Sequence, residues 1–268
     1  MRIFFYGTLI ISCLFGAWIT HHSAQDATWT SRQLYPLESL LAHNNQHCQG
    51  PHQKLLKQIL QAGRKQGSLA SQVAYLSPNG EMSVCASAPR GETPNLNARY
   101  RYASLTKLFT AQAVLTLMAE QALPLNTPLS QLVPEVNSAQ DSRWAEVTIE
   151  QLLTHSAGLD RLRSYDPMTR HAVTPWCPGD MEQLKKFTLD FDPGTDYGYS
   201  NLTYCLLGLV VEQLTHVPFT DALESTLSIN KFGMQFIAGP NLPDEVEYDF
   251  RHTGFYSENY YEYMEFPA

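Results

Sequence analysis

Several features that mark other classes of protein are scarce or absent in this sequence. Only 16% of the 268 residues are charged, no run of like charges stands out, and the net charge is −8. Nucleic acids and anionic membranes are bound through a basic face, so the composition argues against both partners. We find no C-x-x-C pair, no zinc-ligand spacing and no phosphate-binding glycine loop. We therefore expect neither a metal nor an organic cofactor.

Long apolar runs are confined to the N-terminus. Arg2 precedes an apolar run from Ile3 to Ile19, and the small residues Ser23 and Ala24 follow it. This is the layout of a secretory signal. We predict a signal peptide over residues 1–24 that is removed on export, leaving a periplasmic or secreted protein. The alternative is an uncleaved membrane anchor, because the run approaches the minimum length of a span.

The sequence contains few cysteines, and whether their number is even decides whether all of them can form disulfides. Removal of the signal peptide leaves four cysteines, an even number that permits disulfides in an oxidising compartment. Four cysteines allow three pairings, and the sequence leaves the choice open. A small buried side chain is the alternative for the cysteine in "TYCLLGLVV". The four residues are Cys48, Cys85, Cys177 and Cys205.

The first part of the mature chain predicts a helix followed by a hairpin. We expect residues 25–50 to be irregular and residues 51–268 to form one domain. Residues 51–67 place four apolar side chains on one helical face, before a glycine that can end the helix. Residues 71–88 predict a hairpin, because Val73 and Tyr75 alternate with other residues before Asn79-Gly80, a pair that suits a tight turn. The four apolar residues are Leu55, Leu56, Ile59 and Leu60.

The middle of the chain is helical. A helix after Ser104 is apolar on most sides, which is typical of a helix buried at the centre of a domain. Short helical pieces and chain breakers fill residues 124–179, and a second strongly apolar helix follows Asn201. A hairpin combined with a helical insertion indicates the α+β class.

Ser-x-x-Lys occurs twice, at Ser104/Lys107 and at Ser228/Lys231. A serine hydroxyl needs a nearby base to act as a nucleophile, and a lysine three residues later shares its helix face. The first pair opens an apolar helix, whose free backbone N–H groups can face a developing oxyanion. The second pair ends a surface-type helix, so we predict that only the first is catalytic.

A second polar pair completes the set. The sequence contains one Tyr-x-Asn, formed by Tyr199 and Asn201, in a loop before the second apolar helix. A tyrosine held near a serine can relay its proton. The structural alternative is a turn in which Tyr199 packs and Asn201 caps the helix.

Four segments in order resemble the serine β-lactamase-like hydrolases, which include class C β-lactamases, D-alanyl-D-alanine carboxypeptidases and esterases. They are "ASLTK", "LPLNTPLSQLVPEV", "VTIEQLLTHSAGL" and "DPGTDYGYSNLTYCLLGLVVEQLT", within Leu55 to Met234. The resemblance implies a β-lactamase/transpeptidase-like fold, an antiparallel sheet with a helical domain. It implies Ser104 as the acylated nucleophile, Lys107 as its base partner, Tyr199 as a proton shuttle and Asn201 as a contact to Lys107 and substrate. It also implies that His155 is structural.

One family motif has no clear counterpart. A Lys/His-Thr-Gly strand supplies the second oxyanion donor in the family, and the only candidate here is His252-Thr253-Gly254. It follows Asn201 closely and precedes a Tyr- and Glu-rich end, so we interpret it as a chance match. On that reading the C-terminal strands and closing helix are missing, and the chain is truncated before the third motif.

Two hypotheses follow. The first is a serine acyl-transfer hydrolase of the cell envelope acting on a cell-wall peptide, a β-lactam or an ester. The second is a non-catalytic or degenerate member that binds a ligand or is inactive. We expect a small-molecule or peptide substrate, and no stable membrane partner unless the N-terminal segment is retained as an anchor.

Overall fold

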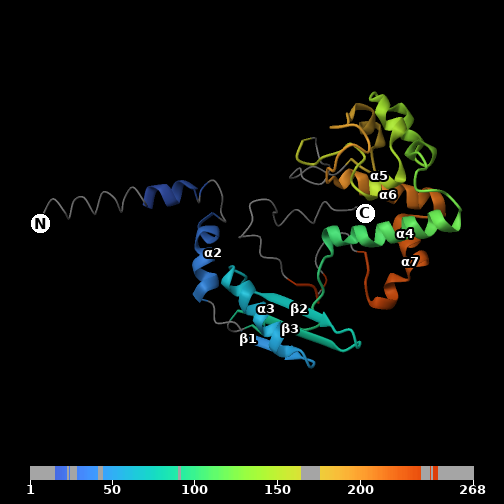
Figure 1. Cartoon of the computed structure of the whole chain (residues 1–268). Coiled ribbons are helices and arrows are strands. Elements are labelled where there is room, and N and C mark those ends of the chain that lie inside the picture. Colours follow the sequence, from blue (N-terminus) through green and yellow to red (C-terminus); the bar gives the residue numbers. More distant parts are fainter. Residues whose placement is uncertain are drawn as a thin grey trace, which may run out of the picture. The chain divides into compact units, whose positions relative to one another are not determined.

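The chain folds into two compact units. The computed structural model describes residues 16–22, 24, 29–41, 45–89, 92–163, 176–236, 242 and 244–246. One unit comprises residues 1–100 with 241–257, and the other comprises residues 101–240 with 258–268 (Figure 1). The predicted domain boundaries, with one domain over residues 51–268, stay a prediction.

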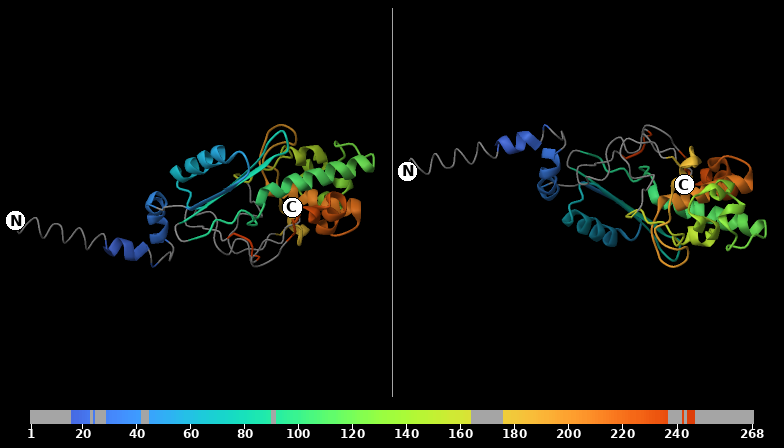
Figure 2. Two further views of the ribbon diagram at one scale, coloured as in Figure 1. Left: turned by 90° about the horizontal axis from the view of Figure 1, so that it is seen from below. Right: turned by 90° about the horizontal axis from the view of Figure 1, so that it is seen from above.

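The first unit is a small antiparallel sheet covered by a helix. Strands β1 (Asn45–Gln49), β2 (Ser71–Leu76) and β3 (Met82–Ala88) lie in the order β1-β3-β2. Helix α3 (Gln53–Lys65) packs against β2 and β3, on one face of the sheet in all views (Figure 2). Between them lies a small core of Leu56, Leu60 and Cys85.

The predicted hairpin is confirmed. Strands β2 and β3 pair in antiparallel register from Ser71↔Ser87 to Leu76↔Met82. In the turn, the Ser77 N–H donates to the Glu81 carbonyl at 2.9 Å, and Gly80 takes the positive φ (81°) that favours glycine. The predicted helix is also present, but Leu55 and Ile59 are exposed while Leu56 and Leu60 are buried. The apolar face is therefore narrower than the sequence indicated.

Residues 25–50 are not irregular, which corrects that expectation. They contain α2 (Trp29–Leu41) and the strand β1. Pro36 lies inside α2, although a proline usually breaks a helix, so the sequence shows little sign of this helix. Strand β1, "NQHCQ", has no apolar alternation, and it exists because its backbone pairs with β3 along the sheet edge.

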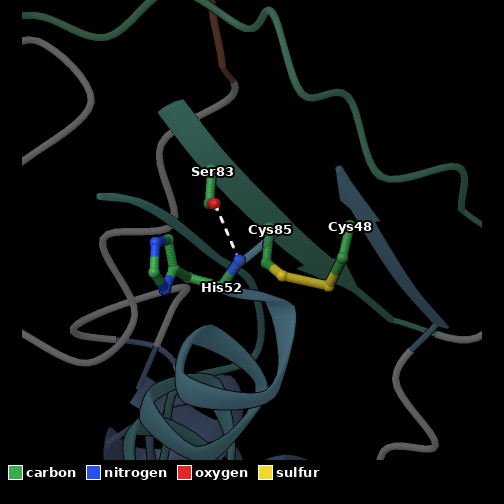
Figure 3. The surroundings of a disulfide bond; sticks show 4 residues. All are labelled: Cys48, His52, Ser83 and Cys85. Atoms are coloured by element: carbon green, nitrogen blue, oxygen red, sulfur yellow. Dashed lines mark hydrogen bonds between the residues drawn. A yellow bond between two sulfur atoms is a disulfide. The ribbon is translucent and has the colours of Figure 1, made fainter. Parts of the chain in front are cut away.

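A disulfide joins β1 to β3. Cys48 and Cys85 face each other in the strand register and are bonded. Figure 3 shows this bridge beside the start of α3, where the His52 N–H donates to Ser83 Oγ at 3.0 Å. Gly50 joins the strand to the helix, and a Cβ there would lie 2.4 Å from the Met82 carbonyl oxygen. The bridge and this close contact fix where α3 begins.

The second unit is helical. Its main helices are α4 (Thr106–Glu120), α6 (Asn201–Thr215) and α7 (Phe219–Leu227), which pack against one another (Figure 1). The short α5 (Ile149–Leu153) packs on α6 and starts with a capping box between Thr148 and Gln151. The connections are short 3-10 turns: η2 (Leu129–Gln131), η3 (Pro134–Ser138), η4 (Ser142–Glu146), η5 (Met181–Lys186) and η6 (Ile229–Phe232). A small antiparallel sheet and a helical unit confirm the predicted α+β class.

Helix α4 is less buried than predicted. Val114, Leu117 and Met118 lie in the core, whereas Leu108 and Leu115 are 68% and 42% exposed. The buried residues of α4 lie on one face of the helix, so part of its apolar surface stays outside the helical core. Helix α6 is the element that is buried along most of its length.

Within the described residues, no single helix has the length and hydropathy that a membrane span needs. Helices α6 and α7 meet that test only as a pair, and they are bent by 72° at the break between them. Residues 1–15 of the predicted signal peptide lie outside the described residues, and residues 16–22 are helical.

Candidate active site

Ser104 lies in a strained turn that leads into α4. The turn is η1 (Ala103–Leu105), and Ala103 has a φ of +46°, which residues with a side chain rarely adopt. The Leu105 N–H donates to the Tyr102 carbonyl at 2.9 Å and closes the turn. Strain of this kind gathers at functional sites, because the surrounding structure has to hold it. Ser104 is exposed just before the N-terminus of α4, where the backbone N–H groups have no partner within the helix.

The hydroxyl of Ser104 meets the hydroxyl of Tyr199. The two oxygens are 2.8 Å apart, and either can be the donor. Tyr199 precedes α6, so the turn before one core helix and the loop before another converge on this contact. The Tyr199 hydroxyl also lies 3.4 Å from Asn201 Oδ1, in position to donate to it.

Lys107 and Asn201 form the buried side of the site. Lys107 Nζ donates to Asn201 Oδ1 at 2.8 Å, and each residue is only 9% exposed. Lys107 follows Ser104 by three residues, so the two face the same way from the start of α4. The described residues contain no direct hydrogen bond between Ser104 and Lys107. Their link runs through Tyr199 and Asn201, which places all four predicted site residues in one hydrogen-bonded chain.

Two tyrosine rings flank the Lys107 ammonium, but only one of them offers its hydroxyl to Ser104. Nζ lies 5.4 Å from the ring centroids of Tyr199 and of Tyr204, within the range of a cation–π contact. The Tyr204 hydroxyl donates to the Leu153 carbonyl at 3.2 Å. Burial, and secondarily the charge of Tyr199, raises the pKa of Tyr204, which therefore stays a neutral phenol. Tyr199 is the tyrosine in position to exchange a proton with Ser104.

Two loops bound together by their backbones hold Tyr199 in place. One loop follows α5 (residues 155–163) and the other precedes α6 (residues 189–200). Their backbone hydrogen bonds are Gly198 N–H to His155 O (2.9 Å), Gly194 N–H to Ser156 O (2.7 Å), Asp190 N–H to Gly158 O (2.7 Å) and Arg161 N–H to Tyr199 O (2.9 Å). The position of Tyr199 is thus set by main-chain atoms on both sides.

Glycine is required where these loops approach most closely. A Cβ on Gly198 would lie 2.4 Å from the Leu159 carbonyl oxygen, and a Cβ on Gly158 would lie 2.6 Å from the Phe191 carbonyl oxygen. Gly158 also has a φ of +92°. A side chain at either position would push the loops apart and displace Tyr199.

An ion pair anchors the second loop to the helical core. Both Asp141 oxygens accept hydrogen bonds from Arg143, and Oδ2 also accepts from the Leu189 N–H at 2.9 Å. Arg143 in turn donates to the Leu189 carbonyl and to Asp192. Hydrogen bonding to Arg143 lowers the pKa of Asp141 to about 2, so the pair stays charged at neutral pH.

A disulfide and an N-cap position Asn201. Ser200 caps α6 by accepting a hydrogen bond from the Leu202 N–H at 3.2 Å, and Asn201 is the first residue of that helix. Cys205, one turn later, is bonded to Cys177. The structure thus selects one of the three pairings that the sequence left open, Cys48–Cys85 with Cys177–Cys205.

His155 lies beside the site without touching Ser104. Its ring is tilted against the rings of Tyr199 and Tyr204, with centroids 4.6 Å and 5.1 Å away, and its Nδ1 is 3.1 Å from Thr203 Oγ1. Burial, together with the nearby Lys107 charge, lowers its pKa to about 4. The imidazole is therefore neutral at neutral pH, and its contacts fit the structural role expected from the sequence.

The second Ser-x-x-Lys pair is built differently. Ser228 caps the C-terminus of α7 with a φ of +52°, and Lys231 is exposed in η6. Lys107, by contrast, is buried and hydrogen-bonded. His252-Thr253-Gly254, the candidate third motif, lies outside the described residues. No group of three His, Cys, Asp or Glu residues within the described part of the chain is arranged to hold a metal ion.

Sequence reasoning missed three residues of this region. Tyr204 follows Asn201 by three positions and so shares its helix face, a spacing that was visible. Gly198 precedes Tyr199 directly, but the close contact that requires glycine comes from a distant loop. Arg161 lies over the Tyr199 ring, with its guanidinium carbon 4.7 Å from the ring centroid, and no local pattern marks it.

The sequence is similar to known proteins over most of its length. The family model described as Beta-lactamase matches residues 56–234. A putative fimbrial assembly protein FimD of Dichelobacter nodosus is 40% identical over 242 residues, which cover 88% of this chain and 61% of that protein. Among solved structures, a class C β-lactamase (23% identity, TM-score 0.54) matches 68% of this chain and 49% of its own. A D-amino acid amidase from Ochrobactrum anthropi SV3 (23%, TM-score 0.55) matches 68% and 50%.

These matches define the class of protein as one with the β-lactamase/transpeptidase fold. The chain belongs to the β-lactamase family, because the family model covers most of its length. It spans about three-fifths of the length of the Dichelobacter nodosus relative. The two structural neighbours are under 25% identical and support the fold alone.

Proposed function

We propose that the protein is a serine acyl-transfer hydrolase that works through an acyl-Ser104 intermediate. The observation that carries this proposal is the 2.8 Å contact between the hydroxyls of Ser104 and Tyr199, continued through Asn201 to the buried Lys107. A serine hydroxyl needs a proton acceptor within reach to act as a nucleophile, and Tyr199 lies at that distance, on a hydrogen-bonded chain that ends at the Lys107 ammonium.

In the first half-reaction, Ser104 Oγ attacks the substrate carbonyl carbon and a C–O bond forms. The Ser104 proton passes to the Tyr199 oxygen, 2.8 Å away, as Tyr199 passes its own phenolic proton toward the leaving group. The tetrahedral oxyanion faces the free N–H groups at the start of α4. The bond to the leaving group then breaks, the leaving group takes the proton from Tyr199, and the acyl-enzyme remains.

In the second half-reaction, water replaces the leaving group. Tyr199 accepts a proton from water as the water oxygen attacks the acyl carbon. The bond to Ser104 Oγ breaks, and the proton returns to Oγ. The product is a carboxylic acid, and the enzyme is regenerated. Proton transfer by one positioned group is worth about 10²–10⁴ in rate.

A covalent probe tests the proposal. An activated ester or a fluorescent β-lactam should add its acyl group to the intact protein, and peptide mass spectrometry should place that mass on Ser104. Ser104→Ala should abolish the adduct, and Ser228→Ala should leave it unchanged. An adduct that survives in Ser104→Ala would refute the assignment of the nucleophile.

We further propose that the enzyme acts in the cell envelope on a peptide, β-lactam or ester, after loss of a signal peptide over residues 1–24. The apolar run at residues 3–19 and two paired disulfides support an exported protein. Mass spectrometry of the mature N-terminus tests this. Cleavage near Ala24 is the expected result, and an intact Met1 on a membrane-bound product would favour the anchor.

A second candidate is a role in fimbrial assembly that does not require catalysis. The 40% identity to a putative fimbrial assembly protein favours it. The two candidates separate in one experiment, in which a strain lacking the gene is complemented with the wild type or with Ser104→Ala. Recovery of surface fimbriae by both would support a non-catalytic role, and recovery by the wild type alone would support an enzymatic one.

A further inference from the structure

Arg161 lies beside the Ser104–Tyr199 pair and has no part in the reaction steps above. Its guanidinium carbon is 4.7 Å from the centroid of the Tyr199 ring, and its backbone N–H donates to the Tyr199 carbonyl at 2.9 Å. The residue is exposed. A cation is therefore held against the ring of the tyrosine whose hydroxyl contacts Ser104, on a loop whose position is tied to that of Tyr199.

Apart from its contact with the Tyr199 ring, the Arg161 side chain has no carboxylate partner within the described residues. Asp160, its neighbour, accepts from the Leu162 N–H at 2.9 Å and pairs with Arg163 at 3.5 Å. Arg143 shows what a structural arginine looks like in this fold, since it binds Asp141, Asp192 and the Leu189 carbonyl.

The Arg161 guanidinium donates no hydrogen bond to another described residue, so its N–H groups are available. These groups form a planar fork of donors that matches the two oxygens of a carboxylate. On a chain with a net charge of −8, a cation beside Tyr199 that has no acidic partner among the described residues would attract an anionic group.

We propose that Arg161 is a specificity-determining residue that binds a carboxylate of the substrate, so that the enzyme prefers carboxylate-bearing substrates over their neutral counterparts. The inference rests on the proposed acyl-transfer function and names a feature of its substrate. Arg161 makes this contact through its guanidinium edge while its face remains on Tyr199.

The competing explanation is that Arg161 only positions the Tyr199 ring. A loss of activity in an Arg161 variant would not separate the two, because a displaced Tyr199 slows the reaction with every substrate. The ratio of kcat/KM for a charged and a neutral substrate does separate them. Any general effect on Tyr199 cancels in that ratio.

The test uses aryl esters of dicarboxylic acids with chains from adipate upward, each paired with its terminal carboxamide. The paired probes share the reacting ester and differ in the distal charge. The wild type should favour the carboxylate probe at the best chain length. Arg161→Gln should lower the carboxylate-to-carboxamide ratio about tenfold, the scale of a hydrogen-bonded charge contact in a partly exposed site.

Two further variants sharpen the result. Arg161→Lys keeps the charge but loses the fork, so it should retain part of the preference. Arg163→Gln removes another exposed arginine, two positions away, and should leave the ratio unchanged. Added salt should lower the wild-type ratio and leave that of Arg161→Gln nearly constant.

The outcomes are distinct. A ratio that stays constant in Arg161→Gln, while the neutral probe is still hydrolysed, would overturn the carboxylate assignment and leave the hydrolase intact. An equal loss with both probes would make Arg161 a positioning residue only. Failure of the wild type to hydrolyse either probe at any chain length would overturn the proposed function and this inference with it.

Discussion

The ammonium group of Lys107 lies 2.8 Å from the side-chain oxygen of Asn201, although 94 residues separate the two in the chain. Both residues are nearly buried. The contact ties α4 to α6 through polar groups inside an otherwise apolar core, so it bears on stability as well as on chemistry.

Breaking this contact from one side should destabilise the protein. Asn201→Leu leaves a buried ammonium without its acceptor, and we expect the free energy of unfolding to fall by about 1.5–3 kcal/mol. Urea unfolding followed by circular dichroism measures it. Removing both partners, as Lys107→Met with Asn201→Leu, should cost less than the sum of the single changes. Strict additivity would show that the two side chains do not interact.

Tyr199→Phe should slow acylation while leaving the fold in place. The ring and its contacts remain, and only the hydroxyl that faces Ser104 is lost. We expect the rate of Ser104 labelling to fall by about 10²–10⁴. Stopped-flow fluorescence with an acylating probe gives the rate. Tyr197→Phe is the matched control, since Tyr197 is 65% exposed. In that variant Ser104 should be labelled at the wild-type rate.

Gly198→Ala should destabilise the second unit and reduce acylation together. A Cβ would lie 2.4 Å from the Leu159 carbonyl oxygen, so the two loops must separate. Overpacking of this kind costs about 1–3 kcal/mol. Gly63→Ala is the control, because a Cβ there finds ordinary contacts and the residue is inside α3. That substitution should stabilise the protein by about 0.4–1 kcal/mol. Equal effects at both positions would contradict the steric argument.

Stability should fall between pH 6.5 and pH 4 because of His155. Its pKa is lowered from 6.5 to about 4 in the folded protein, mainly by burial. As the pH drops through this window the unfolded chain binds a proton that the folded chain does not, which favours unfolding. Above pH 6.5 the histidine is neutral in both states and contributes no slope. Asp141, with a pKa near 2, loses its stabilising charge only at lower pH.

Urea midpoints at several pH values test this prediction. The wild type should lose stability over the window, and His155→Gln should show a shallower dependence. His47, exposed on β1, gives a control substitution. A slope that persists unchanged in His155→Gln would assign the titration to another group.

The residues that meet at the site were predictable because their signals are local. Ser104 and Lys107 share a helix turn, Tyr199 and Asn201 flank a helix start, and their order along the chain matches a family. The Asn79-Gly80 turn was similarly local. Each such signal spans only a few residues, so it depends on neighbours in the chain and not on contacts with distant segments.

The rest depends on contacts between distant segments. Strand β1 has no pattern of its own and exists through pairing with β3. The disulfide partners Cys177 and Cys205 are separated by 28 positions, and only the fold selects them. Leu108 reads as a core residue from its helix, yet it is 68% exposed because the neighbouring helices of its unit pack on another side. Arg161 reaches Tyr199 across the paired loops, a proximity that no spacing encodes.

The backbone pairing of the loops at residues 155–163 and 189–200 has a consequence for how such a protein can change. Because main-chain atoms make those bonds, a change of side chain does not remove them. Apart from the glycines at the points of closest approach and the two carboxylates that hold the loops, Asp190 and Asp192, the loop positions can take up new residues. The chain therefore separates the groups that perform a reaction from those that choose the molecule, which makes it a scaffold for diversification.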